Sequence, residues 1–189
     1  MATNTTSPSP DIEGGKHVLF RLGNETYGLL LMELQEVIAQ YEVTAIPELP
    51  EHYVGVLALR RAIIPVLSLR RRFGLPTRSR DRGTRVIILD VEPSAIGIEV
   101  DEVARVTSID AADIEPPGDL RRERPYLRGM SNLDDGKLVI HLNGRRLLEG
   151  EDHIGPDVLR EAMRAQAEST KSGRNTGEDP YNEQTGDTE

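Results

Sequence analysis

The sequence predicts an all-β fold, a small barrel or sandwich, for most of its 189 residues. Apolar runs short enough to be strands recur at intervals of roughly 8–12 residues, a spacing typical of such folds. Gly, Pro, Asn and Asp stand between the runs, where turns need them. Long helical periodicity is nearly absent before residue 150. We therefore expect at least eight strands in one domain that carries tails.

The most informative stretch is residues 54–75, VGVLALRRAIIPVLSLRRRFGL. It holds two apolar runs, Val54–Leu59 and Ala62–Leu69, on either side of Arg60-Arg61. Each run is too short to span a membrane and has the length of a buried strand. Two such strands joined by two arginines predict a hairpin with a charged, exposed tip. Pro65 predicts that the second strand lies at a sheet edge or carries a bulge.

The remaining elements follow the same short-strand pattern on both sides of this hairpin. The exceptions are residues 32–38, whose apolar spacing favours one or two turns of helix, and residues 115–125, a Pro-rich loop in which we expect neither strand nor helix. The expected strands are residues 17–22, 26–31, 43–46, 84–91, 95–103 (with alternation continuing to Ile109), 126–135 and 136–142, and a short helix is expected at residues 145–148.

Both ends of the chain differ in composition from the strand-rich part. Residues 1–16 are rich in Thr, Ser, Pro and Gly and predict a disordered arm. Residues 150–168 predict a helix with a narrow apolar stripe, and residues 169–189 a disordered acidic tail. The predicted domain is therefore residues 17–149. Residues 149–189 carry 11 acids and four bases, so most of the formal net charge of −9 comes from this end.

Several function classes are disfavoured by what the sequence lacks. It has no Cys, so thiolate chemistry and disulfides are excluded. The four histidines show no metal-ligand spacing, and no nucleophile or phosphate-loop motif is present. We therefore predict no enzyme, no metal and no cofactor. The N-terminus has no apolar signal core and no run reaches about 18 apolar residues, which predicts a cytoplasmic protein without direct membrane insertion.

Nucleic-acid binding is the main alternative from another class. Small barrels bind nucleic acids, and the arginines between residues 60 and 85 could form a basic stripe. However, such barrels usually stack bases on aromatic side chains. The chain has two Phe, five Tyr and no Trp, and Phe20, Tyr27 and Phe73 are expected in the core or at turns. Residues 17–148 are also close to neutral, so we favour a protein–protein adaptor and predict no nucleic-acid partner.

The central stretch resembles the signature of CheW-like domains, roughly G-V-x-N-L-R-G-x-x-x-P-V-x-D-L-R-x-x-F. The opening strands resemble the family's F-x-L-G-x-x-x-Y-G-I pattern. The resemblance covers about residues 17–149. The matching positions are Phe20, Leu22, Gly23, Tyr27, Gly28, Gly55, Val56, Leu59, Arg60, Pro65, Val66, Leu69, Arg70 and Phe73.

This resemblance implies a specific fold and function. The fold would be two small five-stranded SH3/OB-like barrels packed together. The protein would be a non-enzymatic adaptor that couples the cytoplasmic tips of methyl-accepting chemoreceptors to the regulatory domain of a CheA-type histidine kinase. A CheW-like scaffold of a pilus or gliding system is the alternative within the family. The absence of a receiver domain argues against a CheV-like fusion.

The resemblance also implies which residues bind the receptor. Aliphatic side chains would pack against a receptor helix in the groove between the barrels, while Glu36 and Arg60 would fix the orientation of that helix through charged hydrogen bonds. Val86, Val103 and Val106 could equally be core residues. Arg61 is a candidate for the rim of the same site. The implied receptor-groove residues are Leu34, Glu36, Val37, Arg60, Val86, Val103 and Val106.

Three positions depart from the family signature. Ala58 replaces Asn, Arg61 replaces Gly and Ser68 replaces Asp. A family glycine at a hairpin joint suggests a positive φ, so Arg61 would be strained there by roughly 1 kcal/mol. Ser68 would still cap the helical turn that starts at Leu69. These departures bear on the identity of the partner more than on the fold.

Overall fold

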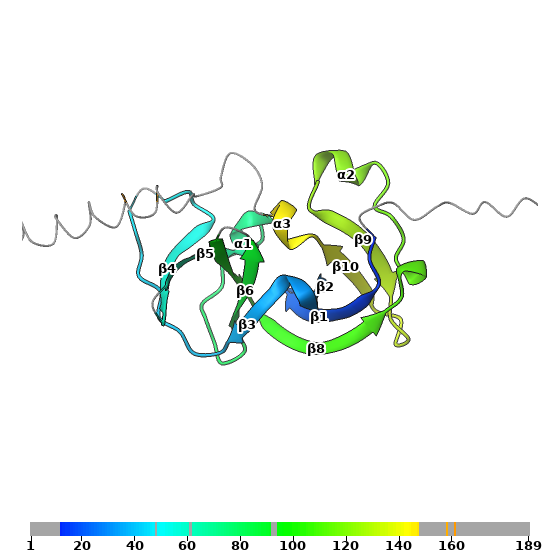
Figure 1. Ribbon diagram of the computed structural model, residues 1–189, viewed down its shortest axis with the longest axis horizontal. Coiled ribbons are helices and arrows are strands. Elements are labelled where there is room, and N and C mark those ends of the chain that lie inside the picture. The colour runs from blue at the N-terminus through cyan, green and yellow to red at the C-terminus, as the bar shows by residue number, and fades with distance from the viewer. Residues whose placement is uncertain are drawn as a thin grey trace, which may run out of the picture.

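The computed structural model describes residues 12–47, 49–60, 62–91 and 94–147, except the side chain of Ser94, and also Val158 and Glu161. It is built of short strands and single helical turns (Figure 1). The strands are β1 (Gly15–Leu22), β2 (Glu25–Leu30), β3 (Leu34–Ile38), β4 (Tyr53–Leu59), β5 (Ala62–Ser68), β6 (Arg85–Val91), β7 (Ser94–Val100), β8 (Glu102–Ile109), β9 (Leu127–Asn132) and β10 (Leu138–Leu142). The turns are η1 (Leu31–Glu33), α1 (Leu69–Arg72), η2 (Ala111–Asp113), α2 (Leu120–Glu123) and α3 (Gly144–Leu147).

The strands form two five-stranded sheets. The first has the order β8-β1-β2-β10-β9 and the second the order β3-β6-β7-β5-β4. Neighbours are antiparallel except for β2 with β10 and β5 with β7, which run parallel. The chain starts in the first sheet, crosses to the second at β3 and returns at β8. The all-β prediction and its two five-stranded units are confirmed.

Inner strands of the two sheets, such as β1 and β6, are buried on both faces, which explains the continuous apolar runs in the sequence. In β6, Val86 and Ile88 pack into a cluster inside the second sheet, whereas Ile87 and Leu89 pack into a cluster shared by both sheets. Successive side chains of a strand point to opposite faces of its sheet. A run of four apolar residues therefore places two side chains in each of the two clusters.

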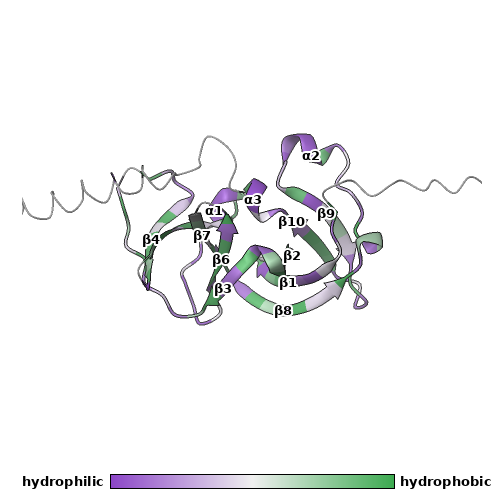
Figure 2. Ribbon diagram, in the orientation of Figure 1, coloured by the Kyte–Doolittle hydropathy of each residue, from purple (hydrophilic) through white to green (hydrophobic). Residues whose placement is uncertain are grey.

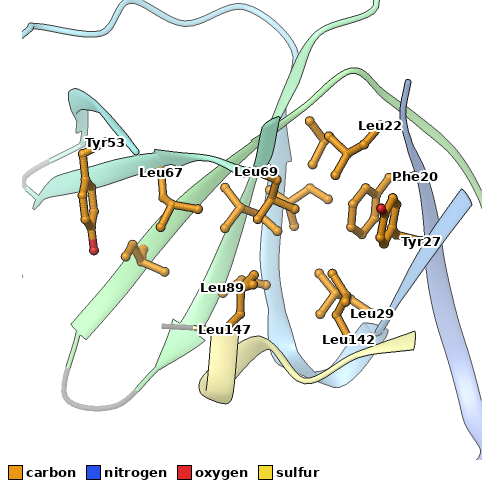
Figure 3. Packing of buried hydrophobic residues seen from close by; sticks show 14 of the residues in the cluster. Phe20, Leu22, Tyr27, Leu29, Tyr53, Leu67, Leu69, Leu89, Leu142 and Leu147 are labelled. Carbon is orange, nitrogen blue, oxygen red and sulfur yellow. The ribbon is translucent and has the colours of Figure 1, made fainter. Parts of the chain in front are cut away.

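The shared cluster is the largest and joins the two sheets (Figure 3). The first sheet contributes Phe20 and Leu29, and the second contributes Leu67 and Leu89, all at most 2% exposed. Each fully buried side chain of this size stabilises the fold by about 1.5–3 kcal/mol, before the cost of chain ordering. The two sheets therefore form one cooperative core.

The helix predicted over residues 32–38 is wrong for most of its length. Only η1 is helical, and Leu34–Ile38 forms strand β3. This strand pairs with β6, with Leu34 opposite Leu89 and Val37 opposite Ile87. The apolar spacing is ambiguous over such a short segment, and the open edge of β6 decides the outcome through backbone pairing.

Three smaller predictions also need correction. Residues 43–46 form no strand, because Thr44 makes only an isolated bridge to Val56. The strand predicted over residues 95–103 breaks at Asp101, where the chain leaves β7 and enters β8. The loop over residues 115–125 contains one helical turn, α2, since its Arg-Arg-Glu segment has no proline.

Pro65 does not put β5 at a sheet edge, because β5 lies between β7 and β4. Only the last three residues of β5, Val66–Ser68, pair with β7. Pro65 lies just before them, where β4 is the only neighbour, so its missing N–H interrupts no ladder with β7. The register shift of this hairpin lies in β4, between Tyr53 and Gly55.

An ion pair holds the sheets together at the return crossing. Asp101 lies between β7 and β8 and accepts two hydrogen bonds from Arg70 of α1, each 2.6 Å long. It also accepts a 2.7 Å bond from the Gly23 backbone N–H in the β1–β2 turn. Burial alone would raise the pKa of Asp101, but the bonds from Arg70 and Gly23 hold it below its usual value.

We predict that Asp101→Asn destabilises the protein by about 2 kcal/mol or more, because it leaves the mostly buried Arg70 without a counter-charge. Glu102→Gln is a matched control: Glu102 also pairs with an arginine, Arg21, but both side chains are about half exposed. Its effect should stay within about 0.5 kcal/mol. Urea unfolding of both variants measures the difference. Equal midpoints would show that Asp101 stabilises the fold no more than the exposed Glu102 does.

Two histidines are buried side by side in the first sheet. His17 and His141 are at most 1% exposed, and their rings meet edge to face at 4.7 Å. His17 donates from Nδ1 to the Gly15 carbonyl, and His141 Nε2 lies 2.8 Å from the Ser131 hydroxyl. Burial lowers the pKa of both rings, that of His141 to about 3, and the nearby Arg128 guanidinium lowers both further. Both rings are buried within strands and neutral.

These rings predict a loss of stability in mild acid. The unfolded chain protonates them near pH 6.5, whereas the folded chain does so only at lower pH, so unfolding takes up protons as the pH falls. For His141, whose pKa in the folded protein is about 3, the loss is up to about 1.4 kcal/mol per pH unit between about pH 7.5 and about pH 5. Urea unfolding across this range checks the slope. His141→Gln should flatten it, and an unchanged slope would show that the folded protein accommodates the charged ring.

The predicted C-terminal helix and acidic tail lie almost wholly outside the described residues, as do residues 1–11 of the predicted arm. Residues 12–16 of that arm are described: Ile12 is buried in a cluster with Leu19 and Val139, and β1 begins at Gly15. Val158 and Glu161 are helical and exposed. The closing helix predicted at residues 145–148 is α3, shifted by one residue. Within the described ranges no helix has the length and apolar character needed to cross a membrane.

Candidate protein-docking site

The predicted receptor-binding residues lie on β3, on the β4–β5 hairpin tip, on β6 and on β8. β3 and β8 are edge strands of different sheets and run along the same lower side of the molecule in Figure 1. Val37 of β3 is 41% exposed and Val106 of β8 is 51% exposed. Leu34 and Val103 are half-buried and both pack against the shared cluster. The two edges therefore present aliphatic side chains next to the junction of the sheets.

Arg60 and Glu36 are brought together by the fold. The Arg60 Nη2 and Glu36 Oε1 atoms are 3.6 Å apart, although 24 residues separate them in sequence. The Arg60 side chain is 80% exposed and that of Glu36 33%. An exposed pair at this separation contributes at most a few tenths of a kcal/mol to stability. Both groups therefore remain available to a partner.

Arg60 has a backbone conformation that is unusual for its residue type. Its φ is +55°, and it is the one non-glycine residue with positive φ among those described. Since Leu59 pairs with Ala62, Arg60 opens a two-residue hairpin loop, which favours positive φ at this place. The strain that the sequence suggested for Arg61 is present at Arg60. Arg61 itself lies outside the described residues.

Val86 is not part of an accessible surface. It is 0% exposed and packs with Leu57, Ile64 and Ile88 inside the second sheet. A receptor could reach Val86 only if β6 moved. Val86 is therefore a core residue and not a residue of the receptor groove. The pattern of β6, buried on both faces, explains the error. Val106, in contrast, is exposed and remains a candidate, as does the half-buried Val103.

Sequence reasoning missed a cleft beside the hairpin. It has a volume of about 730 Å³ and lies between the loop after β3 and the end of β4. Leu57 and Ile38 contribute apolar lining. At its rim Tyr41 donates a 2.8 Å hydrogen bond to Glu99, which also accepts a 2.5 Å bond from Arg80. No local motif marks the cleft, because its walls come from three separate segments, residues 38–44, 57–59 and 80–84.

Two of the departures from the family signature can now be placed. Ala58 is exposed and lines this cleft, so the change from Asn removes a polar group from a surface a partner can reach. Ser68 precedes α1 at its N-cap but makes no side-chain capping bond, so the predicted cap is wrong. Ser68 is 5% exposed, and its backbone N–H donates to the His52 carbonyl instead.

The described residues also bear on the alternatives. They contain no group of three or more His, Asp or Glu side chains placed to hold a metal ion. The aromatic side chains are used for packing: Phe20 stacks on Tyr27 at 5.8 Å, and Phe73 on Tyr126 at 5.3 Å. Phe20 and Tyr27 are at most 7% exposed, so they offer no platform for bases. The geometry favours protein docking over nucleic-acid binding.

Comparison with known proteins agrees with this fold. The family model described as a CheW-like domain matches residues 16–152, which is most of the chain. The chain belongs to this family. It is 33% identical over 141 residues to the chemotaxis protein CheW of Klebsiella aerogenes, covering 74% of this chain and 84% of that one. The same-named protein of Treponema pallidum is 36% identical over 104 residues, covering 53% and 61%.

A solved CheW structure has the same architecture. The scaffolding protein TtCheW from Thermoanaerobacter tengcongensis matches with a TM-score of 0.68 and 35% identity, over 74% of this chain and 95% of that one. The chain also matches the chemotaxis protein CheV3 of Helicobacter pylori at 25% identity, over 41% of the length of that protein. The relatives are thus chemotaxis proteins, and the solved one is a scaffold.

We predict that Arg60→Gly stabilises the fold by several tenths to about 1 kcal/mol, because glycine adopts positive φ without strain. Arg60→Lys is the matched control: it keeps both the Cβ and the charge and should leave stability unchanged. Denaturant titration measures both variants. Destabilisation by Arg60→Gly would show that contacts of the side chain outweigh the strain of the turn.

Proposed function

We propose that this protein is a non-enzymatic chemotaxis adaptor that couples chemoreceptors to a CheA-type histidine kinase. The observation that carries the proposal is the exposed aliphatic surface of β3 and β8, with the Arg60–Glu36 pair beside it, in a member of the CheW-like family. The scaffolding role of TtCheW supports it. The cytoplasmic location predicted from the sequence belongs to the same proposal.

The surface suits an amphipathic helix. Leu34, Val37, Val103 and Val106 can contact the apolar side of a receptor helix, and burying exposed aliphatic area gives most of the affinity. Arg60 and Glu36 carry opposite charges at one end of this surface. Charged pairs at an interface set orientation and partner choice more than raw affinity. The receptor tip is therefore assigned to this surface, and the kinase regulatory domain to another.

The cleft beside the hairpin supports a variant of this function. Its wall carries Ala58, where the family signature has Asn. A change on a partner-accessible wall alters specificity without altering the fold. We therefore retain, as a second candidate, a scaffold of the same kind that serves a pilus or gliding system rather than flagellar chemotaxis.

A charge reversal at Arg60 tests the proposal. Arg60→Glu places a second carboxylate beside Glu36, so we expect affinity for a purified receptor cytoplasmic fragment from the same organism to fall about 30-fold or more, which is about 2 kcal/mol. Stability should change by no more than about 0.5 kcal/mol, because the exposed pair contributes little. Isothermal titration measures binding, and urea unfolding measures stability.

Arg82→Glu is the matched control, since Arg82 is an exposed loop arginine outside the proposed surface. It should bind the fragment as the unmodified protein does. If Arg60→Glu and Arg82→Glu bind the fragment equally well, Arg60 does not contribute to receptor binding. That result would not contradict the adaptor function itself. An unmodified protein that binds neither the receptor fragment nor the kinase regulatory domain would refute the function itself.

A further inference from the structure

Arg128 is a buried charge on β9 of the first sheet. Its side chain is only 5% exposed, and its Nη2 atom donates a 2.6 Å hydrogen bond to Glu33 Oε1. Its Nε and Nη1 atoms are buried and form no hydrogen bond with a described residue. The neighbouring rings of His17 and His141 are neutral and offer no counter-charge. Among the described residues, Glu33 is therefore the one group that compensates the charge of Arg128.

Glu33 ties the start of β3 to the opposite sheet. It is the last residue of η1 and directly precedes Leu34, the first residue of β3. Its carboxylate also accepts a 3.2 Å hydrogen bond from the backbone N–H of Gly144, where α3 begins after β10. β9 and β10 belong to the first sheet, whereas β3 pairs with β6 of the second. β3 lies next to β6, and η1 leads into it from the side of β1 (Figures 1 and 2).

Gly144 leaves room for this carboxylate. A Cβ atom at position 144 would lie 3.2 Å from Glu33 Oε2 and 3.2 Å from the side chain of Leu89, which is closer than ordinary van der Waals contact. Gly144 does not have a positive φ, so the turn itself does not require glycine here. What glycine permits at this position is the close approach of the Glu33 side chain to the backbone.

Backbone pairing alone does not fix the start of β3. This edge strand has five residues and pairs with β6 along one side. Its register shifts between Leu34, which is opposite Leu89, and Glu36, which is opposite Ile88. Such a bulge inserts one extra residue, and a slip by one residue turns every following side chain to the other face of the sheet. An anchor directly before Leu34 therefore helps to decide where the side chains of β3 point.

We propose that Glu33 and Arg128 are positioning residues for the receptor surface. Their ion pair holds β3 in the register that places Glu36 beside Arg60 and leaves Val37 exposed. This inference rests on the proposed adaptor function, since it concerns the same surface. Arg128 is buried and Glu33 is only 20% exposed, so the pair acts through β3 and not by contact with the receptor. Loss of the pair should therefore lower receptor affinity although no contacting side chain is changed.

A double variant of the full chain separates positioning from stability. Arg128→Met with Glu33→Gln removes both charges and keeps the side-chain sizes similar, so no unpaired buried charge remains and the urea midpoint should not fall. We expect the purified receptor cytoplasmic fragment to bind at least about tenfold more weakly. Amide hydrogen exchange in β3 should be at least about tenfold faster than in the unmodified protein, and unchanged in β10. Affinity for the kinase regulatory domain, which is assigned to another surface, should stay the same.

Arg82→Met with Asp113→Asn is the matched control, because it removes one charge of each sign from exposed positions outside the receptor surface. It should leave both affinities and the exchange of β3 unchanged. Unchanged receptor affinity or unchanged β3 exchange in the Arg128→Met, Glu33→Gln protein would overturn the proposal. So would an equal loss of receptor and kinase binding together with a lower urea midpoint, which would show that the pair supports the whole fold and not β3 in particular.

If the double variant does not fold, Glu33→Asp provides the same comparison. It keeps the charge but draws the carboxylate back by one methylene group from Arg128 and Gly144, so receptor affinity should fall while kinase affinity does not. Equal receptor affinity of Glu33→Asp and the unmodified protein would then overturn the proposal. An unmodified protein that does not bind the receptor fragment would refute the proposed function instead, and the exchange of β3 would still show whether the ion pair holds this strand.

Discussion

The bidentate contact between Arg70 and Asp101 is the constraint on which the arrangement of the two sheets depends. Apolar packing between sheets is not directional, so the shared cluster alone would tolerate small rotations of one sheet against the other. A planar guanidinium that faces a carboxylate at two points tolerates few orientations. Because Asp101 also accepts from Gly23, the contact ties α1 of the second sheet to the first turn of the first sheet.

The geometry of the candidate docking surface depends on how the two sheets are held at the Arg70–Asp101 contact. β3 and β8 belong to different sheets, so the separation of Val37 from Val106 depends on how the sheets are oriented. The chain crosses between sheets immediately before β3 and immediately before β8, and Asp101 lies at the second crossing. Asp101, which is outside the candidate docking surface, thereby helps to determine where Val37 and Val106 lie relative to each other.

Local patterns predicted much of the fold and less of the site. The hairpin around Arg60, the paired strands β6 and β7 and the closing helix α3 could be predicted, because run length and turn residues determine them. Strand β3 could not, since its conformation is imposed by the edge of β6. Val86 illustrates the limit for the site: in a strand buried on both faces, sequence alone does not tell a core valine from a partner-facing one. The family resemblance implied that Glu36 and Arg60 belong to one binding site, but not that they lie against each other; the fold brings them within 3.6 Å.

The topology also imposes an order of events during synthesis. β3 to β7 are continuous in sequence, so the second sheet can form as soon as residue 100 has left the ribosome. The first sheet is split: β1 and β2 are made early, but β2 pairs with β10 through contacts such as Thr26 with Val139. Closing so long a loop is slow, and an open strand edge can pair with another chain meanwhile. The nascent protein must therefore protect the free edge of β2 until the other end of its domain is made.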